Sequence, residues 1–354
     1  MKILMLARKT LNTSPGGDTV QINSTAKYLR LLGVQVDVKI AGEVIDYNNY
    51  DLMHFFNIIR PDDILPHILK SSLPFAVSTI FVDYSEYEKN RGGKIGLLAN
   101  LIDGDLLEYI KAVGRLIKNG DKINSFRYLV SGHRASIRFI AKRASALLPN
   151  SHNEYKRFVN KYNVTRPYFK IPNAIDREVF IGSVIGDPKF KDHVLCVGRI
   201  EGRKNQLNLI KALFDTDMQL TIIGKPSPNH MSYYNECVSL VNKNKNMQII
   251  EHVNHNDLAT MMSAAKVHVL PSWFETTGLS TLEAAIMNCN VVVTSKGDTT
   301  EYFGDLAYYC QPDDIESIKS AVLKAFNDPF QVELKELIKS EYVWQKTAEE
   351  TLHA

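Results

Sequence analysis

Apolar positions along the chain follow two alternating patterns. Short apolar runs bounded by glycine, proline or polar residues are typical of buried parallel strands, and longer segments with apolar residues every three or four positions are typical of amphipathic helices. We expect a first helix that begins at Asp18 as its N-cap and ends at Gly33. The other elements predicted in the first half are strands at 2–7, 34–40, 51–56, 75–80 and 146–149, and helices at 95–118, 125–144 and after Ser151.

A turn at Pro172-Asn173 interrupts this alternation, which then starts again. The second half contains strands predicted at 194–197, 219–223, 247–250, 267–270 and 290–294, a helix at 207–214, and a last amphipathic helix at 343–352. Strands that alternate with helices form parallel sheets covered on both faces. The fold class is therefore α/β, with two Rossmann-like, doubly wound domains at residues 1–172 and 173–343 that face a cleft.

Composition narrows the class of protein. The 354 residues are 45% hydrophobic and 23% charged, which excludes a mainly disordered chain, and no apolar run approaches the roughly 18 residues of a membrane span. The apolar start, residues 1–7, is shorter than the apolar core of a secretion signal. The four cysteines, all beyond residue 195, lack the spacing of a disulfide framework or zinc site, so we expect reduced thiols and a cytoplasmic protein.

Charge is distributed unevenly. Lys and Arg outnumber Asp and Glu by 10 in residues 1–172 and are outnumbered by 7 in the remainder, which together give the net charge of +3. Arg134, Arg138 and Lys142 would share one face of a helix. A basic first half favours an anionic partner such as a membrane surface or lipid phosphate, and its alternative is a solvated surface. No nucleic-acid-binding motif accompanies this charge, so we expect no nucleic-acid partner.

The richest motif is Ser272-Trp273-Phe274-Glu275-Thr276-Thr277-Gly278-Leu279, which leads from a predicted strand into a helix containing Glu283. Free N–H groups at a helix N-terminus bind phosphate, and Gly278 allows the backbone to approach closely. Glu283 can accept hydrogen bonds from both hydroxyls of a ribose, and Glu275 can hold sugar hydroxyls. The alternative is a surface loop with two solvated glutamates.

Two further motifs follow predicted strands. Gly198-Arg199 ends one strand, and Lys204 comes shortly before the next helix, so the two cations could bind a diphosphate from two sides; the alternative is a solvated basic turn. Gly16-Gly17 lies between the first strand and the first helix. It lacks the Gly-x-Gly-x-x-Gly spacing of a dinucleotide fingerprint, but it would permit a ligand to approach the backbone.

With these motifs the chain resembles the retaining glycosyltransferase family 4 of the GT-B superfold (glycosyl transferases group 1), over nearly its whole length. The resemblance rests on Gly16-Gly17, Pro172-Asn173 with Asp176, Gly198-Arg199 with Lys204, and Glu275 with Glu283. It implies that Arg199 and Lys204 grip the donor diphosphate, that Glu275 contacts the donor sugar, and that Glu283 contacts the ribose. It also implies that the last helix, at 344–354, packs back on the first domain.

The chain departs from the family pattern on the acceptor side. His54 is followed two positions later by Phe56, where a second histidine is frequent, and no histidine follows the strand at 75–80. Asp83 is the substitute candidate for a catalytic group. For both Asp83 and His54 the alternative is a polar residue at a strand end, and for His54 we favour that alternative. Ala174 replaces a common glycine.

The resemblance implies a metal-independent hexosyltransferase without a bound cofactor. It would move a hexose from a UDP- or GDP-linked sugar to a glycan or lipid-linked acceptor, as in surface polysaccharide biosynthesis, with retention of configuration. Residues near Gly224, His252 and Val253 would select base and sugar. The basic first domain further predicts peripheral contact with the inner face of an anionic membrane. The alternatives are an epimerase or hydrolase acting on sugar nucleotides with the same fold, and a non-catalytic two-domain sugar-binding protein.

Overall fold

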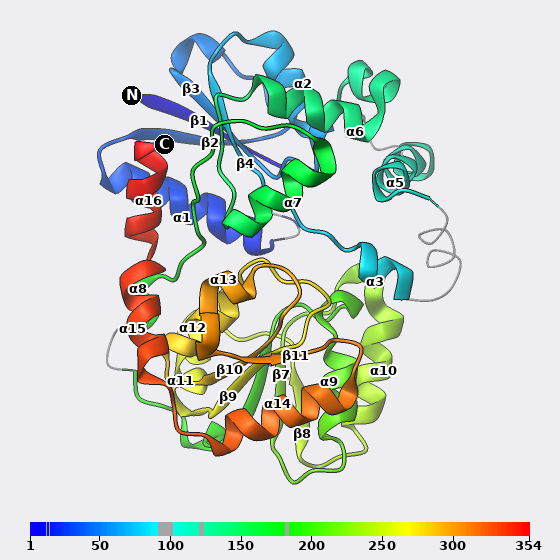
Figure 1. Ribbon diagram of the computed structural model, residues 1–354, viewed down its shortest axis with the longest axis vertical. Helices are drawn as coiled ribbons and strands as arrows, with labels where there is room; N and C mark the ends of the chain where they lie inside the picture. The colour runs from blue at the N-terminus through cyan, green and yellow to red at the C-terminus, as the bar shows by residue number, and fades with distance from the viewer. Residues whose placement is uncertain (12, 14, 91–101, 120–123, 181–183) are drawn as a thin grey trace. The chain divides into compact units, whose positions relative to one another are not determined.

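The computed structural model describes residues 1–11, 13, 15–90, 102–119, 124–180 and 184–354. The chain divides into a first unit, Met1–Asn173 with Trp344–Ala354, and a second unit, Ala174–Val343 (Figure 1). The sequence placed this division at Pro172. The part of the expected helix at 95–101 lies outside the described residues.

The first unit contains a five-stranded parallel sheet in the order β2-β1-β3-β4-β5. Because β1 and β3 are neighbours while the chain winds away from them in both directions, the topological switch point lies between these two strands. The strands are β1 Lys2–Ala7, β2 Gln35–Ile40, β3 Leu52–Phe56, β4 Phe75–Ser78 and β5 Ala146–Leu147.

Helices cover both faces of this sheet. The helix predicted at 125–144 packs its apolar side chains into the core, where Ile137, Ile140, Ala141 and Ala144 are fully buried. Gly132, with φ +75°, kinks that helix. The helices are α1 Gly17–Leu31, α2 Pro61–Lys70, α3 Ser85–Asn90, α5 Gly104–Asn119, α6 Phe126–Arg143, α7 His152–Tyr162 and α16 Trp344–His353, with a 3₁₀ turn at Tyr47–Asn49.

Two details of α1 and α16 complete the first unit. The N-cap of α1 is Gly16, not Asp18, because Asp18 lies in the first turn and binds the Arg8 guanidinium at 2.5 and 3.0 Å. The last helix, α16, belongs to this unit: Ala348 packs with the α1 core, and the Thr347 hydroxyl donates to the Pro172 carbonyl at 2.9 Å.

The second unit contains a six-stranded parallel sheet in the order β11-β10-β9-β6-β7-β8. This is the doubly wound order, with its switch point between β6 and β9. The predicted fold class is confirmed, although β11 was not predicted. The strands are β6 Val194–Val197, β7 Leu220–Ile223, β8 Met247–Ile250, β9 Val267–Leu270, β10 Asn290–Thr294 and β11 Tyr308–Cys310.

Two apolar clusters lie on opposite faces of this sheet. One includes residues of α11, α12 and α15, and the other includes residues of α9, α10 and α14 (Figure 1). All four cysteines are buried and unpaired with one another. The helices are α8 Arg177–Phe180, α9 Gln206–Leu213, α10 Met231–Val241, α11 His255–Ala264, α12 Leu279–Ile286, α13 Thr299–Phe303, α14 Ile315–Asn327 and α15 Val332–Glu341. Short 3₁₀ turns occupy Pro188–Phe190, Gly202–Lys204, Pro228–His230 and Gly304–Leu306.

Across the described residues, no helix is both long enough and apolar enough to span a bilayer.

Candidate active site

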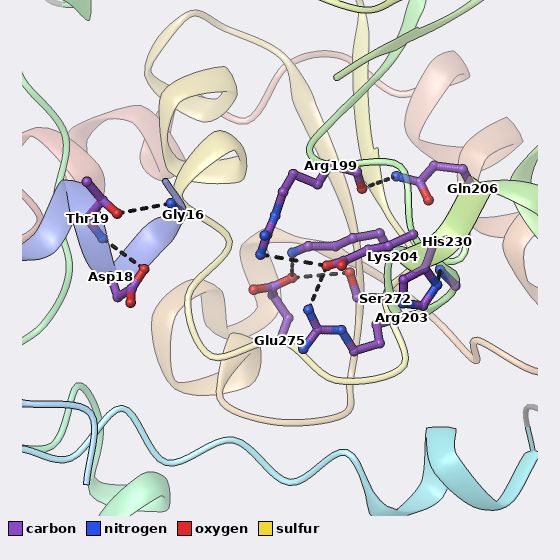
Figure 2. A network of polar contacts seen from close by, with 12 residues as sticks. Gly16, Asp18, Thr19, Arg199, Arg203, Lys204, Gln206, His230, Ser272 and Glu275 are labelled. Atoms are coloured by element: carbon purple, nitrogen blue, oxygen red, sulfur yellow. Dashed lines mark hydrogen bonds and ion pairs between the residues drawn. The ribbon is translucent and has the colours of Figure 1, made fainter. Parts of the chain in front are cut away.

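The candidate site of the second unit lies at the switch point of its sheet, where the loops after β6 and β9 meet. Ligands of doubly wound sheets bind at such carboxyl ends. Figure 2 shows the side chains of Arg199, Arg203 and Lys204, from the first loop, gathered around Ser272 and Glu275, from the second.

Two glycines shape the loop after β6. Gly198 and Gly224 have φ of +156° and +154°, a region that favours glycine. A Cβ on Gly224 would overlap the carbonyl oxygen of Gly198. The loops after β6 and β7 run side by side, since Ile200 N donates to Lys225 O at 2.9 Å. The absence of a side chain at Gly224 therefore allows the loop after β7 to lie against the loop after β6, which contains Arg199 and Lys204.

An ion pair joins the two loops. Lys204 Nζ lies 2.6 Å from Glu275 Oε2, and the Ser272 hydroxyl donates to the same oxygen at 3.1 Å. The Lys204 side chain is 25% exposed and that of Glu275 is 11% exposed. The structure thus brings together two of the residues that the sequence assigned to the donor.

Glu201 is a member of this cluster that the sequence analysis missed. Its side chain is 4% exposed, and its Oε1 lies 2.9 Å from Arg203 and 4.0 Å from Arg199. Burial alone raises the pKa of Glu201, but the Arg203 and Arg199 guanidiniums outweigh it and hold the pKa below its usual value. The sequence signal for Glu201 was an acidic residue within the basic turn that contains Arg199 and Arg203. Such a residue neutralises part of the positive charge of the turn and orients the two arginines.

The loop after β9 ends in an anion-binding geometry. Gly278 has φ +69° and is the N-cap of α12, where a Cβ would lie 2.8 Å from Thr281 Oγ1. Among the described residues, the backbone N–H groups of Gly278, Leu279 and Ser280 have no hydrogen-bond acceptor. These N–H groups and the helix dipole favour a phosphate here. Thr276 is half-buried and Thr277 is buried in the same loop.

The backbone of Glu275 is fixed by the loop after β10. Glu275 N donates to Lys296 O at 3.0 Å, and Asp298 N donates to Glu275 O at 2.9 Å. Gly297 lies between these two contacts with φ +107°, and a Cβ there would overlap the Glu275 carbonyl. Gly297 was also missed by the sequence analysis; its signal was a glycine in the loop that follows the predicted strand at 290–294.

Glu283 lies one turn inside α12 and is half-buried. Burial raises the pKa of its carboxyl to about 8. Among the described residues no hydrogen bond or ion pair is formed by this carboxyl. A carboxyl group that is desolvated without a partner is a common feature of binding and active sites.

His252 and Val253 follow β8, the edge strand two positions from β6. His252 is exposed, and Val253 packs against the core. No described contact joins either residue to the Lys204–Glu275 pair. Their assignment to base selection stays a prediction.

The candidates in the first unit have local structural contacts. Gly16 is extended, with φ −155°, and Gly17 is the first residue of α1. Asp83 Oδ1 accepts from Ser85 N at 3.0 Å at the start of α3. His54 is buried within β3, 2.9 Å from the Ser78 hydroxyl, and burial lowers its pKa to about 3. His54 thus has the contacts of a neutral core histidine in the middle of β3, and not those of a residue at a strand end.

In the described part of the chain, no three His, Cys, Asp or Glu side chains gather closely enough to hold a metal ion. Metal independence nonetheless stays a prediction.

Comparisons with known proteins show which family the second half of the chain resembles. Residues 183–344 match the family model described as Glycosyl transferases group 1. The chain is 30% identical over 173 residues to a D-inositol 3-phosphate glycosyltransferase of Arthrobacter sp. (strain FB24). That match covers 45% of this chain but only 41% of the relative, less than half of its length.

Solved structures extend the likeness to the whole chain. Sucrose-phosphate synthase from Thermosynechococcus elongatus gives a TM-score of 0.76 at 13% identity, with 99% of this chain and 97% of that chain covered. HepE of Anabaena, in complex with UDP-glucose, gives 0.71 at 14% identity, with 100% and 99% covered. The architecture is therefore the GT-B fold of glycosyltransferases. Residues 183–344, which match the glycosyl transferases group 1 model, cover most of the second unit.

Proposed function

We propose that this chain transfers a hexosyl group from a nucleotide diphosphate sugar to a glycan or lipid-linked acceptor, with retention of configuration and without a metal ion. One observation carries the proposal. Arg199, Lys204 and the free N–H groups at the start of α12 lie at the same sheet edge as Glu275 and Glu283. A nucleotide sugar requires cations to bind its phosphates and carboxylates to accept hydrogen bonds from its sugar hydroxyls, and this edge of the sheet has both.

Catalysis would rest on stabilising the leaving group. The bond between C1 of the hexose and the diphosphate oxygen breaks, and negative charge develops on that oxygen. Lys204 and Arg199, with the N-terminus of α12, would stabilise this charge in preorganised positions. The resemblance to retaining enzymes further implies that the acceptor oxygen attacks C1 from the same face and that the leaving phosphate takes its proton.

The acceptor class rests on charge. Residues 1–172 have an excess of 10 positively charged side chains. One relative is named as a glycosyltransferase of an anionic compound, D-inositol 3-phosphate. An anionic acceptor, such as a lipid-linked intermediate of surface polysaccharide biosynthesis at the inner face of a membrane, fits this excess. If so, transfer falls as salt rises and increases with anionic vesicles. Activity insensitive to both would favour a neutral acceptor.

The test is a panel of UDP-, GDP- and ADP-hexoses, each assayed for nucleoside diphosphate release with and without a pool of candidate acceptors. A transferase releases nucleoside diphosphate mainly when an acceptor is present, and a glycosylated product appears by mass spectrometry. Rapid conversion of donor alone would indicate an epimerase or hydrolase. Binding without turnover of any donor would indicate a sugar-binding protein.

A further inference from the structure

Two residues proposed to bind different parts of the donor form an ion pair with each other. Lys204 is assigned to the diphosphate and Glu275 to the sugar, yet Lys204 Nζ lies 2.6 Å from Glu275 Oε2. Both side chains are largely buried, so solvent weakens their attraction only in part. A donor that enters this site therefore meets an existing ion pair and not a free cation.

The backbones on both sides of this pair are fixed. Glu275 is held by Lys296 and Asp298, and the Gly297 backbone packs directly on its carbonyl. On the other side, Lys204 N donates to Glu201 O at 2.9 Å. The next residue, Asn205, binds the carbonyls of Pro271 and Pro312 at 3.0 and 2.7 Å. Rearrangement of the pair would consequently involve side-chain rotamers and not loop movement.

We propose that Glu275 competes with the donor diphosphate for Lys204, so that the site discriminates the intact nucleotide sugar from the free nucleoside diphosphate. This inference rests on the proposed function, because it takes the diphosphate position at Lys204 from it. It adds a role in ligand discrimination to Glu275, beyond contact with the sugar.

The two ligands differ in the hydrogen-bond donors that they offer to the Glu275 carboxylate. When a phosphate takes Lys204, the Glu275 carboxylate loses its cation and keeps the Ser272 hydroxyl, 3.1 Å away, as its remaining described donor. It also lies near the negative phosphate, which is repulsive in a largely buried site. The hydroxyls of a bound hexose can replace the lost donor, whereas a free nucleoside diphosphate has no group to offer there.

Two consequences follow for turnover. The intact donor is favoured because its sugar satisfies Glu275 while its diphosphate occupies Lys204. After transfer the hexose leaves this position, and Glu275 again competes for Lys204. The pair would thus weaken binding of the product and assist its release.

The experiment is isothermal titration of wild type, Glu275→Gln and the control Glu333→Gln with UDP, GDP and their glucose and mannose conjugates. Glu333 is an exposed residue in the first turn of α15, and the control makes the same change of charge. We expect Glu275→Gln to bind the nucleoside diphosphate about 5-fold more tightly than wild type or better. We also expect it to lose most of the wild-type preference for the sugar conjugate, and Glu333→Gln to match wild type.

Weaker or unchanged nucleoside diphosphate binding by folded Glu275→Gln would overturn the inference. If this variant does not fold, a crystal structure of wild type with the nucleoside diphosphate decides. A Lys204–Glu275 separation beyond about 4 Å supports the competition, and an unaltered 2.6 Å pair overturns it. Failure of wild type to bind any of these nucleotides would instead refute the proposed function.

Discussion

Replacing Glu283 by glutamine should stabilise the unliganded protein while it weakens donor binding. Burial raises the pKa of this carboxyl from the ordinary 4.5 to about 8. The folded state therefore keeps a proton that the unfolded state releases, so wild-type stability falls as pH rises from about 4.5 to about 8. Glutamine has nearly the same shape and does not ionise, so the variant lacks this loss of stability.

The size of the effect follows from the pKa. One pKa unit corresponds to about 1.4 kcal/mol, so complete burial would give roughly 5 kcal/mol between pH 4.5 and pH 8. Glu283 is half-buried, and remaining contact with water reduces this energy, so we expect about 2 kcal/mol at pH 8. For a unit the size of residues 174–343, that is a rise in Tm of roughly 4–8 °C.

The assay is differential scanning calorimetry of wild type and Glu283→Gln at half-unit steps from pH 5 to pH 8.5. The two proteins should have nearly equal Tm at pH 5 and diverge as pH rises, with the variant higher. Titration with the nucleotide sugar at pH 8.5, where most Glu283 side chains are ionised, should show at least 10-fold weaker binding by the variant, because glutamine offers the ribose hydroxyls one acceptor oxygen and not two. A variant less stable than wild type at pH 8, or parallel pH curves, would refute the reasoning.

Three other predictions address the supporting structure. Gly224→Ala should lower the free energy of unfolding by about 2 kcal/mol or more in urea denaturation, because the added Cβ would overlap the Gly198 carbonyl. The control is Gly114→Ala in helix α5, where an added Cβ would meet no atom within 4 Å, and this variant should not destabilise the protein. Equal stability of both variants would contradict the close approach of these loops. Glu154→Gln should lower the free energy of unfolding by about 2 kcal/mol in the same assay, because the buried carboxylate is an acceptor for three donors. These are the Thr79 hydroxyl and the N–H groups of Phe81 and Asn150, the last two at 2.8 and 2.9 Å. A loss of less than about 0.5 kcal/mol would show that these contacts contribute little. Asp83→Asn keeps a group that can cap α3 but removes its charge, so a catalytic Asp83 predicts an unchanged Tm with kcat at least 10-fold lower, and unchanged kcat would remove it from the reaction.

Local sequence was sufficient for most of the strands. The predicted strands at 2–7, 194–197, 247–250, 267–270 and 290–294 have the bounds that the structure shows. Their apolar runs are short and end at glycine, proline or polar residues, so the local pattern indicates where each strand stops. β11, Tyr308–Cys310, was missed because a run of only three residues is too short to show an alternation of apolar and polar positions.

The site was predicted in its parts and not in its connections. Arg199, Lys204 and Glu275 follow strands, and their charge indicated a phosphate and sugar site. Their pairing, and the roles of Glu201 and Gly297, depend on loops that are distant in sequence and adjacent in the sheet. No local pattern encodes which strand neighbours which, so these contacts required the topology.

The most direct test compares nucleoside diphosphate with nucleoside monophosphate binding in wild type and Lys204→Ala. If the cations after β6 and the start of α12 hold the second phosphate, wild type should bind the diphosphate at least 10-fold more tightly than the monophosphate. Lys204→Ala should remain folded by circular dichroism and lose most of that difference. Equal affinity of wild type for both nucleotides, or an undiminished preference in Lys204→Ala, would contradict a diphosphate site at this edge of the sheet.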